Sequence, residues 1–288
     1  MITIFIVLYI VYTSTRLAMN SKLNTFTIKS WNINTKQTQM IDYILGGNER
    51  DSTSIVCLQE FSWDNNPKYQ KYLKLRQIGD NCYQVRNVNK VVVGVFSYNM
   101  GMASTAREIP RTPKYEAHGT LIIWNPNVFC YIGVTEPSYH SLVQDELGHR
   151  STYIVTLATQ DMRFLNVMCV HGHATNSNKK DKLFQSIFNQ INSCNIPTIV
   201  CGDFNYNPTK MYPLFMTTGN LVFNPVNGIT HVNSDTGETY CIDHVVHNQL
   251  VTVSNLRISG IDQQTGSIKN LMQQQKHDHG ILSFQITF

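Results

Sequence analysis

The sequence predicts an α/β sandwich, in which β-sheets pack against each other and against helices. Short apolar runs recur along the 288 residues, some alternating with polar residues and some continuous, and both patterns are typical of β-strands. Segments with apolar residues at helical spacing lie between several of these runs. This succession of strands and helices favours a layered α/β architecture.

The composition is that of a globular protein with a sizeable core. Hydrophobic residues make up 42% of the chain and charged residues 15%, which excludes an intrinsically disordered protein. The formal net charge is +4 and the pI is about 8.6, which is compatible with a polyanionic substrate but too weak to identify one. No internal repeat divides the chain, and its length suits one large domain or two small ones.

The first residues form an apolar run that predicts export. Residues 2–12 are almost wholly apolar, but the run is too short to cross a bilayer as a helix. It matches the hydrophobic part of a secretory signal, and small polar residues follow it. We therefore expect a signal peptide over residues 1–18 and a secreted protein without stable membrane insertion. A short membrane anchor and a buried first strand are the alternatives.

The cysteines predict buried thiols rather than a zinc site. No paired-cysteine or cysteine–histidine spacing typical of zinc ligands is present. Cys82 and Cys194 lie in polar stretches and are a candidate disulfide in an exported protein. The other five lie in apolar strand-like runs and are expected to act as small hydrophobic side chains: Cys57, Cys130, Cys169, Cys201 and Cys241.

The periodicity assigns most of the chain to regular elements. Because only Asn125-Pro126-Asn127 separates two of the predicted strands, they are expected to form a hairpin. Helices are predicted at 35–45, 181–191 and 267–275, and polar loops at 107–114, 224–228 and 233–237. Strands are predicted at 26–32, 54–60, 90–98, 119–124, 128–134, 151–157, 164–170, 198–202, 240–246, 250–258 and 281–286.

Polar side chains gather where the predicted strands end. Asp203 and Asn205 follow a buried β-branched strand and, two residues apart in an extended chain, project to the same side. Each of these polar residues also has a purely structural interpretation: a residue of a turn, the point where a strand meets water, or a structural histidine. The residues concerned are Asn32, Glu60, His171, Asp203, Asn205, Asp278 and His279, with Asp243 inside a strand.

If these strand ends converge, the side chains suit phosphodiester hydrolysis. Oxygen ligands from carboxylates and amides favour Mg²⁺ or Ca²⁺ over zinc. Cleavage needs a base for the attacking water, an acid for the leaving alkoxide, and a cation beside the phosphoryl oxygens. Two histidines whose tautomers are fixed by carboxylates supply the first two. The arginines and the lysine of loop 107–114 are candidate phosphate contacts, or else simply solvated.

The ordered set of motifs resembles the endonuclease/exonuclease/phosphatase superfamily. The motifs are Trp31-Asn32, Leu58-Gln59-Glu60, His171, Gly202-Asp203-Phe204-Asn205, Ile242-Asp243-His244-Val245 and Asp278-His279. Within it the chain is most similar to the B subunit of cytolethal distending toxin. Ser30 to Asn34, Arg150, Val170 to Thr175 and Thr230-His231 carry this narrower resemblance. Where that subunit has serine and an arginine-rich helix, this chain has His277 and mostly glutamine.

The resemblance implies a DNase I-like four-layer α/β sandwich over residues 24–288, with two packed mixed β-sheets flanked by helices. It implies a secreted, Mg²⁺-dependent endodeoxyribonuclease, with Ca²⁺ or Mn²⁺ as alternative ions. DNA and toxin delivery subunits are the expected partners, and the nucleus of a target cell is the expected place of action. The implied residue roles are acid–base catalysis by His171 and His279, orientation of His279 by Asp243, positioning by Asp203 and Asn205, metal binding by Glu60, Asn32 and Asp278, and phosphate binding by Arg150, Arg111 and Asn207.

Two other functions remain open at this point. A phosphoinositide phosphatase or sphingomyelinase would share the same catalytic set, because the loops decide the substrate. A binding protein that uses the fold without catalysis is the third hypothesis. The carboxylate that orients the first histidine in the superfamily falls near Glu116 or His118 and is not assigned.

Overall fold

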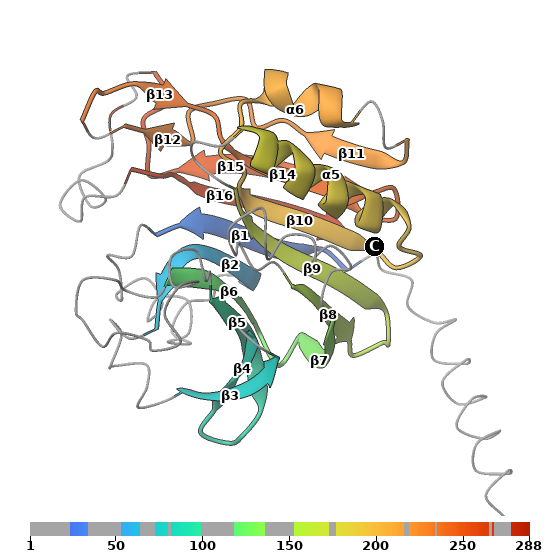
Figure 1. Ribbon diagram of the computed structural model, residues 1–288. Helices are drawn as coiled ribbons and strands as arrows, with labels where there is room; N and C mark the ends of the chain where they lie inside the picture. Colours follow the sequence, from blue (N-terminus) through green and yellow to red (C-terminus); the bar gives the residue numbers. More distant parts are fainter. Residues whose placement is uncertain are drawn as a thin grey trace, which may run out of the picture.

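A computed structural model describes residues 24–33, 53–63, 73–79, 82–98, 118–135, 153–172, 177–215, 219–233, 235–264, 267 and 278–288. Two β-sheets pack face to face in this part of the chain, and helices cover the outer face of one of them (Figure 1). Both sheets contain parallel and antiparallel neighbours. The predicted DNase I-like sandwich of two packed mixed sheets is confirmed.

The first sheet contains eight of the described strands, in the order β15-β16-β1-β2-β6-β5-β4-β3. Strands β1 and β2 run parallel, and the other described pairs are antiparallel. The strands are β1 (Phe26–Asn32), β2 (Thr53–Ser62), β3 (Leu73–Gly79), β4 (Cys82–Asn87), β5 (Val92–Tyr98), β6 (His118–Trp124), β15 (Thr252–Ser259) and β16 (Ile281–Thr287).

The second sheet contains six described strands, in the order β11-β14-β10-β9-β8-β7. Its parallel pair is β9 and β10. The strands are β7 (Phe129–Thr135), β8 (Ile154–Thr159), β9 (Phe164–His171), β10 (Thr198–Asp203), β11 (Leu221–Asn224) and β14 (Asp243–Asn248). A separate two-stranded sheet joins β12 (His231–Val232) to β13 (Thr239–Tyr240).

The main core lies between the two sheets, and strand alternation explains it. In β9 the side chains of Val167 and Cys169 join the core between the sheets, whereas Met168 and Val170 point to the opposite face. Successive side chains of a strand face opposite sides, so β9 is apolar on both. Helix α5 (Ser177–Asn192) covers that second face with a stripe of buried residues at helical spacing: Leu183, Phe184, Ile187, Phe188 and Ile191.

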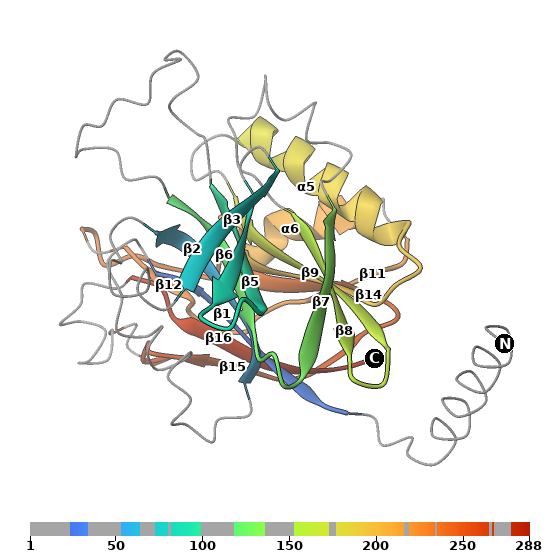
Figure 2. The same cartoon turned by 90° about the horizontal axis from the view of Figure 1, so that it is seen from below.

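The short helix α6 (Pro208–Phe215) follows β10 and lies beside α5 on the same face of the second sheet (Figures 1 and 2). The sequence pattern did not predict this helix. Pro208 occupies the first helical position, where the missing N–H costs nothing, and the buried Met211 anchors the helix to the core. Strand β10 therefore holds one end of the loop after Asp203, and α6 holds the other.

The predicted hairpin of residues 119–134 is wrong. Strand β6 belongs to the first sheet and β7 to the second, although a tight turn at Asn125 joins them. The side chains of Ile122, Trp124 and Phe129 all enter the same core between the sheets. The turn therefore folds the two strands over this core instead of pairing their edges.

Several local predictions differ from the structure. Strands β3, β4 and β11 were not predicted, and Asp243 begins β14 instead of lying in the middle of a strand. Cys130 is exposed, whereas Cys82 is buried. All seven cysteines are free, so the candidate disulfide between Cys82 and Cys194 is not formed.

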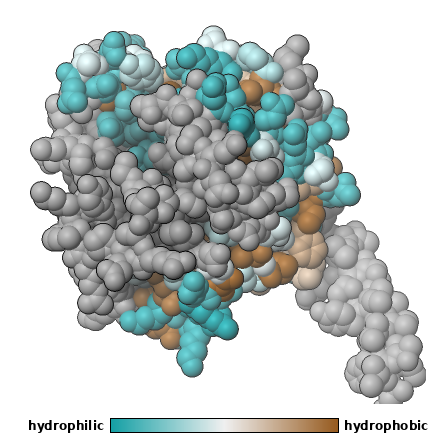
Figure 3. Space-filling model, viewed as in Figure 1, coloured by the Kyte–Doolittle hydropathy of each residue, from teal (hydrophilic) through white to brown (hydrophobic). Residues whose placement is uncertain are grey.

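Other predictions fall on residues outside the described ones. These include the leader, the helix at 35–45, the loop at 107–114 and, apart from Ser267, the helix at 267–275. In the part of the chain that the structure describes, no helix is both long and apolar enough to cross a membrane. The coloured surface in Figure 3 is largely hydrophilic with small hydrophobic patches, as expected when most apolar side chains enter the cores.

Candidate active site

The candidate site lies where parallel strands of both sheets end. Asn32 ends β1 and is paired in register with Gln59 of β2. His171 ends β9 and is paired with Asp203, which ends β10. Asp243 begins the antiparallel neighbour β14, directly opposite Asp203. Pairing within each sheet and packing between the sheets thus bring residues from 32 to 279 to one edge of the sandwich.

Asp203 is the centre of this arrangement. Its carboxylate accepts hydrogen bonds from the Asn32 side-chain amide at 3.1 Å and from the backbone N–H of Asn205 at 2.7 Å. The Nε2 atoms of His171 and His279 each lie 3.8 Å from Asp203 Oδ2. Asp203 is only 2% exposed, so this buried carboxyl group links both predicted histidines.

His279 contacts Asp243, the residue that the resemblance implied would orient it. Its Nδ1 lies 3.0 Å from Asp243 Oδ2, so Nδ1–H donates and Nε2 faces Asp203. Burial lowers the pKa of His279, but the charges of Asp243, Asp203 and Asp278 and the bond to Asp243 outweigh it and raise the pKa to about 10. Burial raises the pKa of Asp203 to about 6, while the charge of His279 opposes this shift. The site therefore favours a charged imidazolium.

Glu60 is aimed at the site by an irregularity in β2. The pairing of β2 with β6 shifts between Leu58 and Phe61, where β2 has one extra residue. Glu60 adopts a φ of 54°, which is rare for a residue with a long side chain. Its carboxylate lies 3.4 Å from His171 Nε2 and 3.4 Å from the Asn32 amide nitrogen. A strained, bulged residue thus places an acid beside a histidine.

The loop after β10 depends on two close backbone approaches. A Cβ on Gly202 would lie 2.1 Å from the carbonyl oxygen of Val170, and the residue has a φ of 146°. A Cβ on Gly172 would lie 2.3 Å from the carbonyl oxygen of Phe204. Asn205 has a φ of 54° and donates its side-chain amide to the carbonyl of Gly172 at 3.0 Å. Only glycine at both positions lets β9 and this loop meet.

Asp278 lies beside His279 and is engaged by His231. Asp278 Oδ2 lies 3.7 Å from His231 Nε2. A backbone bridge pairs His231 with His279, and their rings are 4.5 Å apart. Asp278, His231 and His279 offer donor atoms within 4.8 Å of one another. The metal role predicted for Asp278 stays a prediction.

Sequence reasoning did not assign site roles to His231 and Lys180. The ammonium of Lys180 donates to the backbone carbonyl of Asn205 at 2.7 Å and thereby supports the loop after β10. Lys180 shares the helix face of Leu183, Phe184 and Ile187, and it is only 5% exposed. A lysine on the apolar stripe of an amphipathic helix is the signal that could have identified it.

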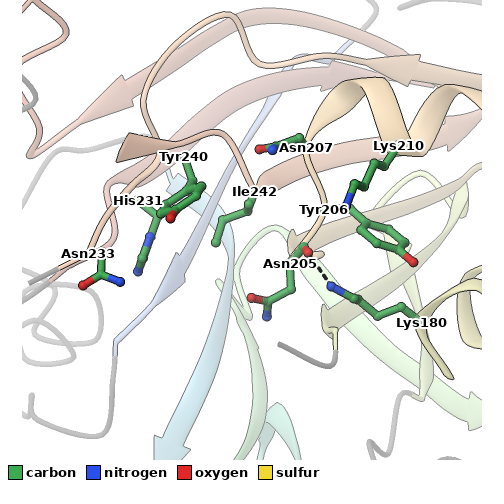
Figure 4. A pocket seen from close by; sticks show the side chains of 9 residues that line it. All are labelled: Lys180, Asn205, Tyr206, Asn207, Lys210, His231, Asn233, Tyr240 and Ile242. Atoms are coloured by element: carbon green, nitrogen blue, oxygen red, sulfur yellow. Dashed lines mark hydrogen bonds between the residues drawn. The ribbon is translucent and has the colours of Figure 1, made fainter. Parts of the chain in front are cut away.

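The predicted phosphate contacts are divided between described and undescribed residues. Arg111 and Arg150 lie outside the described residues. Asn207 lines a cavity next to the site, together with Lys180, Asn205 and His231 (Figure 4). Its predicted contact with substrate is therefore compatible with its position but remains a prediction.

The fold and this site define a protein with the architecture of phosphodiesterases and phosphatases. Residues 30–261 match the Endonuclease/Exonuclease/phosphatase family, so the chain belongs to this family. Its members are hydrolytic phosphodiesterases and phosphatases that typically use divalent metals. A comparison with curated protein sequences gives no match.

Solved structures show the same fold at low sequence identity. TDP2 from D. rerio complexed with single strand DNA product matches with a TM-score of 0.61 and 12% identity, over 92% of this chain and 100% of that one. The human nocturnin catalytic domain with bound sulfate has a TM-score of 0.54 and 16% identity, over 92% and 93% of the two chains. ANGEL2, a 2',3'-cyclic phosphatase, has a TM-score of 0.57 and 13% identity, over 91% and 95%.

The residues at the site fit a divalent metal of the hard, oxygen-binding type. The Glu60 carboxylate is 28% exposed and accepts a hydrogen bond from the Asn32 side-chain N–H at 3.4 Å, so a carboxylate oxygen is accessible beside Asn32. Such donors suit Mg²⁺, Mn²⁺ or Ca²⁺. A metal held here would lie close to His171 and Asp203, where it would offset negative charge on a bound phosphate ester.

Proposed function

We propose that the protein is a divalent-metal-dependent endonuclease that hydrolyses phosphodiester bonds of DNA. The observation that carries the proposal is the position of Asp203, whose carboxylate faces both catalytic-type histidines and the Asn32 amide. Hydrolysis of a phosphate ester needs proton transfer at two oxygens, and these side chains supply two imidazoles around one acid. Their buried, hydrogen-bonded setting keeps the groups in position.

The proposed roles follow the hydrogen bonds. Asp203 and Asn205 hold the attacking water and the phosphate, since one turn fixes both residues. His171 and His279 share the two proton transfers, from the water and to the leaving oxygen. Asp243 is a positioning residue that sets the tautomer of His279.

Glu60 and Asn32 would hold the metal, with Asp278 as the third predicted ligand. Bound there, Mg²⁺ would polarise the phosphoryl oxygens and stabilise the charge that develops on them. Independently of the metal, Glu60 lies 3.4 Å from His171 Nε2 and so orients this ring. The carboxylate expected near Glu116 or His118 stays unassigned, since Glu116 lies outside the described residues.

DNA is proposed as substrate from the motif pattern and from the DNA-bound state of one structural neighbour. We further propose a secreted nuclease of the cytolethal distending toxin B type that works with delivery subunits and acts in the nucleus of a target cell. The predicted signal peptide at residues 1–18 and the motif resemblance support this finer assignment. Activity on phosphoinositides or sphingomyelin is the alternative outcome of the test below.

A plasmid-nicking assay tests the proposal. Wild-type protein with Mg²⁺ is expected to convert supercoiled plasmid to nicked and linear forms, and EDTA is expected to stop it. His171→Ala should lower the rate by about 10²–10⁴-fold, the usual contribution of an acid–base group. The exposed carboxylate variant Asp235→Asn is the control and should cut normally. Intact plasmid together with phosphate or phosphocholine release from lipids would refute the choice of DNA.

A further inference from the structure

A cavity of about 330 Å³ opens beside the candidate active site (Figure 4). Its volume is at the lower end of the range for small-ligand sites. Asn205, which bonds to Asp203, and His231, which packs on His279, form part of its wall. The cavity thus borders the candidate active site through these two residues. Its lining residues are Lys180, Asn205, Tyr206, Asn207, Lys210, His231, Asn233, Tyr240 and Ile242.

The charge on the cavity wall is positive. Lys180 and Lys210 are its charged residues, and none of the nine described residues that line it is acidic. Asn207 immediately precedes α6, and its backbone carbonyl accepts from the N–H groups of Lys210 and Met211. The first turn of α6 contains no acidic side chain, so its positive end adds to the field.

Lys180 gives the cavity one fixed cation. Its ammonium donates to the carbonyl of Asn205 at 2.7 Å and lies 4.3 Å from the centre of the Tyr206 ring. Burial lowers the pKa of Lys180, and the nearby charge of Lys210 lowers it further, although Asp203 and Asp181 oppose this. Two ammonium groups near enough to repel each other would be stabilised by an anion between them.

The opposite wall carries ring side chains with hydrogen-bonding capacity. The rings of His231 and Tyr240 are 5.7 Å apart. His231 Nδ1 is a buried atom without a hydrogen-bond partner in the described structure.

We propose that this cavity binds the phosphate of a nucleotide next to the scissile bond, and so selects polynucleotide strands over isolated phosphate esters. Lys210 and Lys180 would contact that phosphate, and His231 and Tyr240 would contact the attached nucleoside. This inference rests on the proposed nuclease function and adds a specificity subsite to it. Because phosphate contacts dominate nucleic-acid affinity, this subsite would act mainly on KM.

The test uses two single-stranded oligonucleotides and one lysine variant. One substrate has phosphodiester linkages throughout, and the other has a single phosphodiester flanked by uncharged methylphosphonates. Lys210→Gln should raise KM for the charged substrate about tenfold, as expected for one hydrogen bond to a charged group, and change kcat little. For the substrate with uncharged flanks, the ratio of variant to wild-type KM should stay near one. Lys182→Gln, an exposed lysine variant on α5, is the matched control.

Binding measured without turnover gives a second readout. Fluorescence anisotropy in EDTA should show that Lys210→Gln lowers the salt dependence of binding, with the slope against log salt concentration reduced by about 0.7 for one lost phosphate contact. Equal effects of Lys210→Gln on both substrates, with an unchanged salt slope, would overturn the subsite while leaving the nuclease function intact. A wild-type protein inactive on both oligonucleotides and on supercoiled plasmid would overturn the nuclease function itself, and the subsite with it, whereas one that nicks plasmid but cleaves neither oligonucleotide would overturn the subsite alone.

Discussion

Replacing Asp243 with asparagine tests the orientation of His279. The Asp243 carboxylate lies 3.0 Å from His279 Nδ1, and the two residues are 2% and 5% exposed. The bond is charge-assisted and sheltered from water, so it contributes about 1.5–3 kcal/mol. An asparagine amide can replace its geometry but not its charge.

The expected result is a slower enzyme with a less basic histidine. Because Asp243 supplies the largest contribution that raises the pKa of His279 against the lowering effect of burial, Asp243→Asn should bring this pKa down from about 10. Loss of the fixed tautomer should reduce kcat on plasmid DNA by about 10²–10⁴-fold. NMR titration of the His279 ring gives the pKa, and initial rates give kcat.

The same pair predicts how stability depends on pH. The pKa of His279 is raised above its ordinary value of 6.5, so its stabilising effect is fully present below pH 6.5 and is lost as pH rises through about 10. The difference in unfolding free energy between wild type and Asp243→Asn should therefore shrink across this window in urea titrations. A variant with unchanged kcat and an unchanged His279 pKa would refute the reasoning.

Three further predictions concern the loops and the core behind the site. Gly202→Ala should lower the unfolding free energy by about 3 kcal/mol or more in urea titrations, because the added Cβ would lie 2.1 Å from the Val170 carbonyl oxygen. A loss below about 1 kcal/mol, roughly the cost of an ordinary surface change, would contradict this prediction. Burial lowers the pKa of His244, so the unfolding free energy should fall as pH decreases below 6.5, and NMR titration of this ring should give a pKa under that value. Lys180→Met should lower kcat because the hydrogen bond to the Asn205 carbonyl is lost, and Lys180→Arg should restore part of the lost kcat. Equal kcat values for wild type and Lys180→Met would exclude a positioning role for Lys180.

The sequence was informative about the site because the catalytic-type residues follow buried strands. Asn32, His171 and Asp203 each end a strand that is apolar on one or both faces, so their positions at a sheet edge could be predicted from the pattern alone. Parallel pairing then brings such ends together within each sheet. Packing of one sheet on the other, which joins the two sets, was an expectation from the resemblance.

Other features depend on contacts that no local pattern encodes. Strands β3 and β4 carry charged and polar residues along an edge of the sheet, and their alternation is too weak to identify them. The turn at Asn125 has hairpin chemistry, yet burial of apolar residues on both sides of it directs β6 and β7 into different sheets. His231 reaches the site only because its backbone bridges to His279.

In the proposed function, one hydrolytic site is assembled around the Asp203 carboxylate. The most direct test is the single-turnover cleavage rate of a defined DNA duplex by Asp203→Asn, compared with Asp235→Asn and wild type under saturating Mg²⁺. We expect a loss of at least about 10²-fold for Asp203→Asn alone, with an unchanged circular dichroism spectrum. Cleavage by folded Asp203→Asn at the wild-type rate would contradict it.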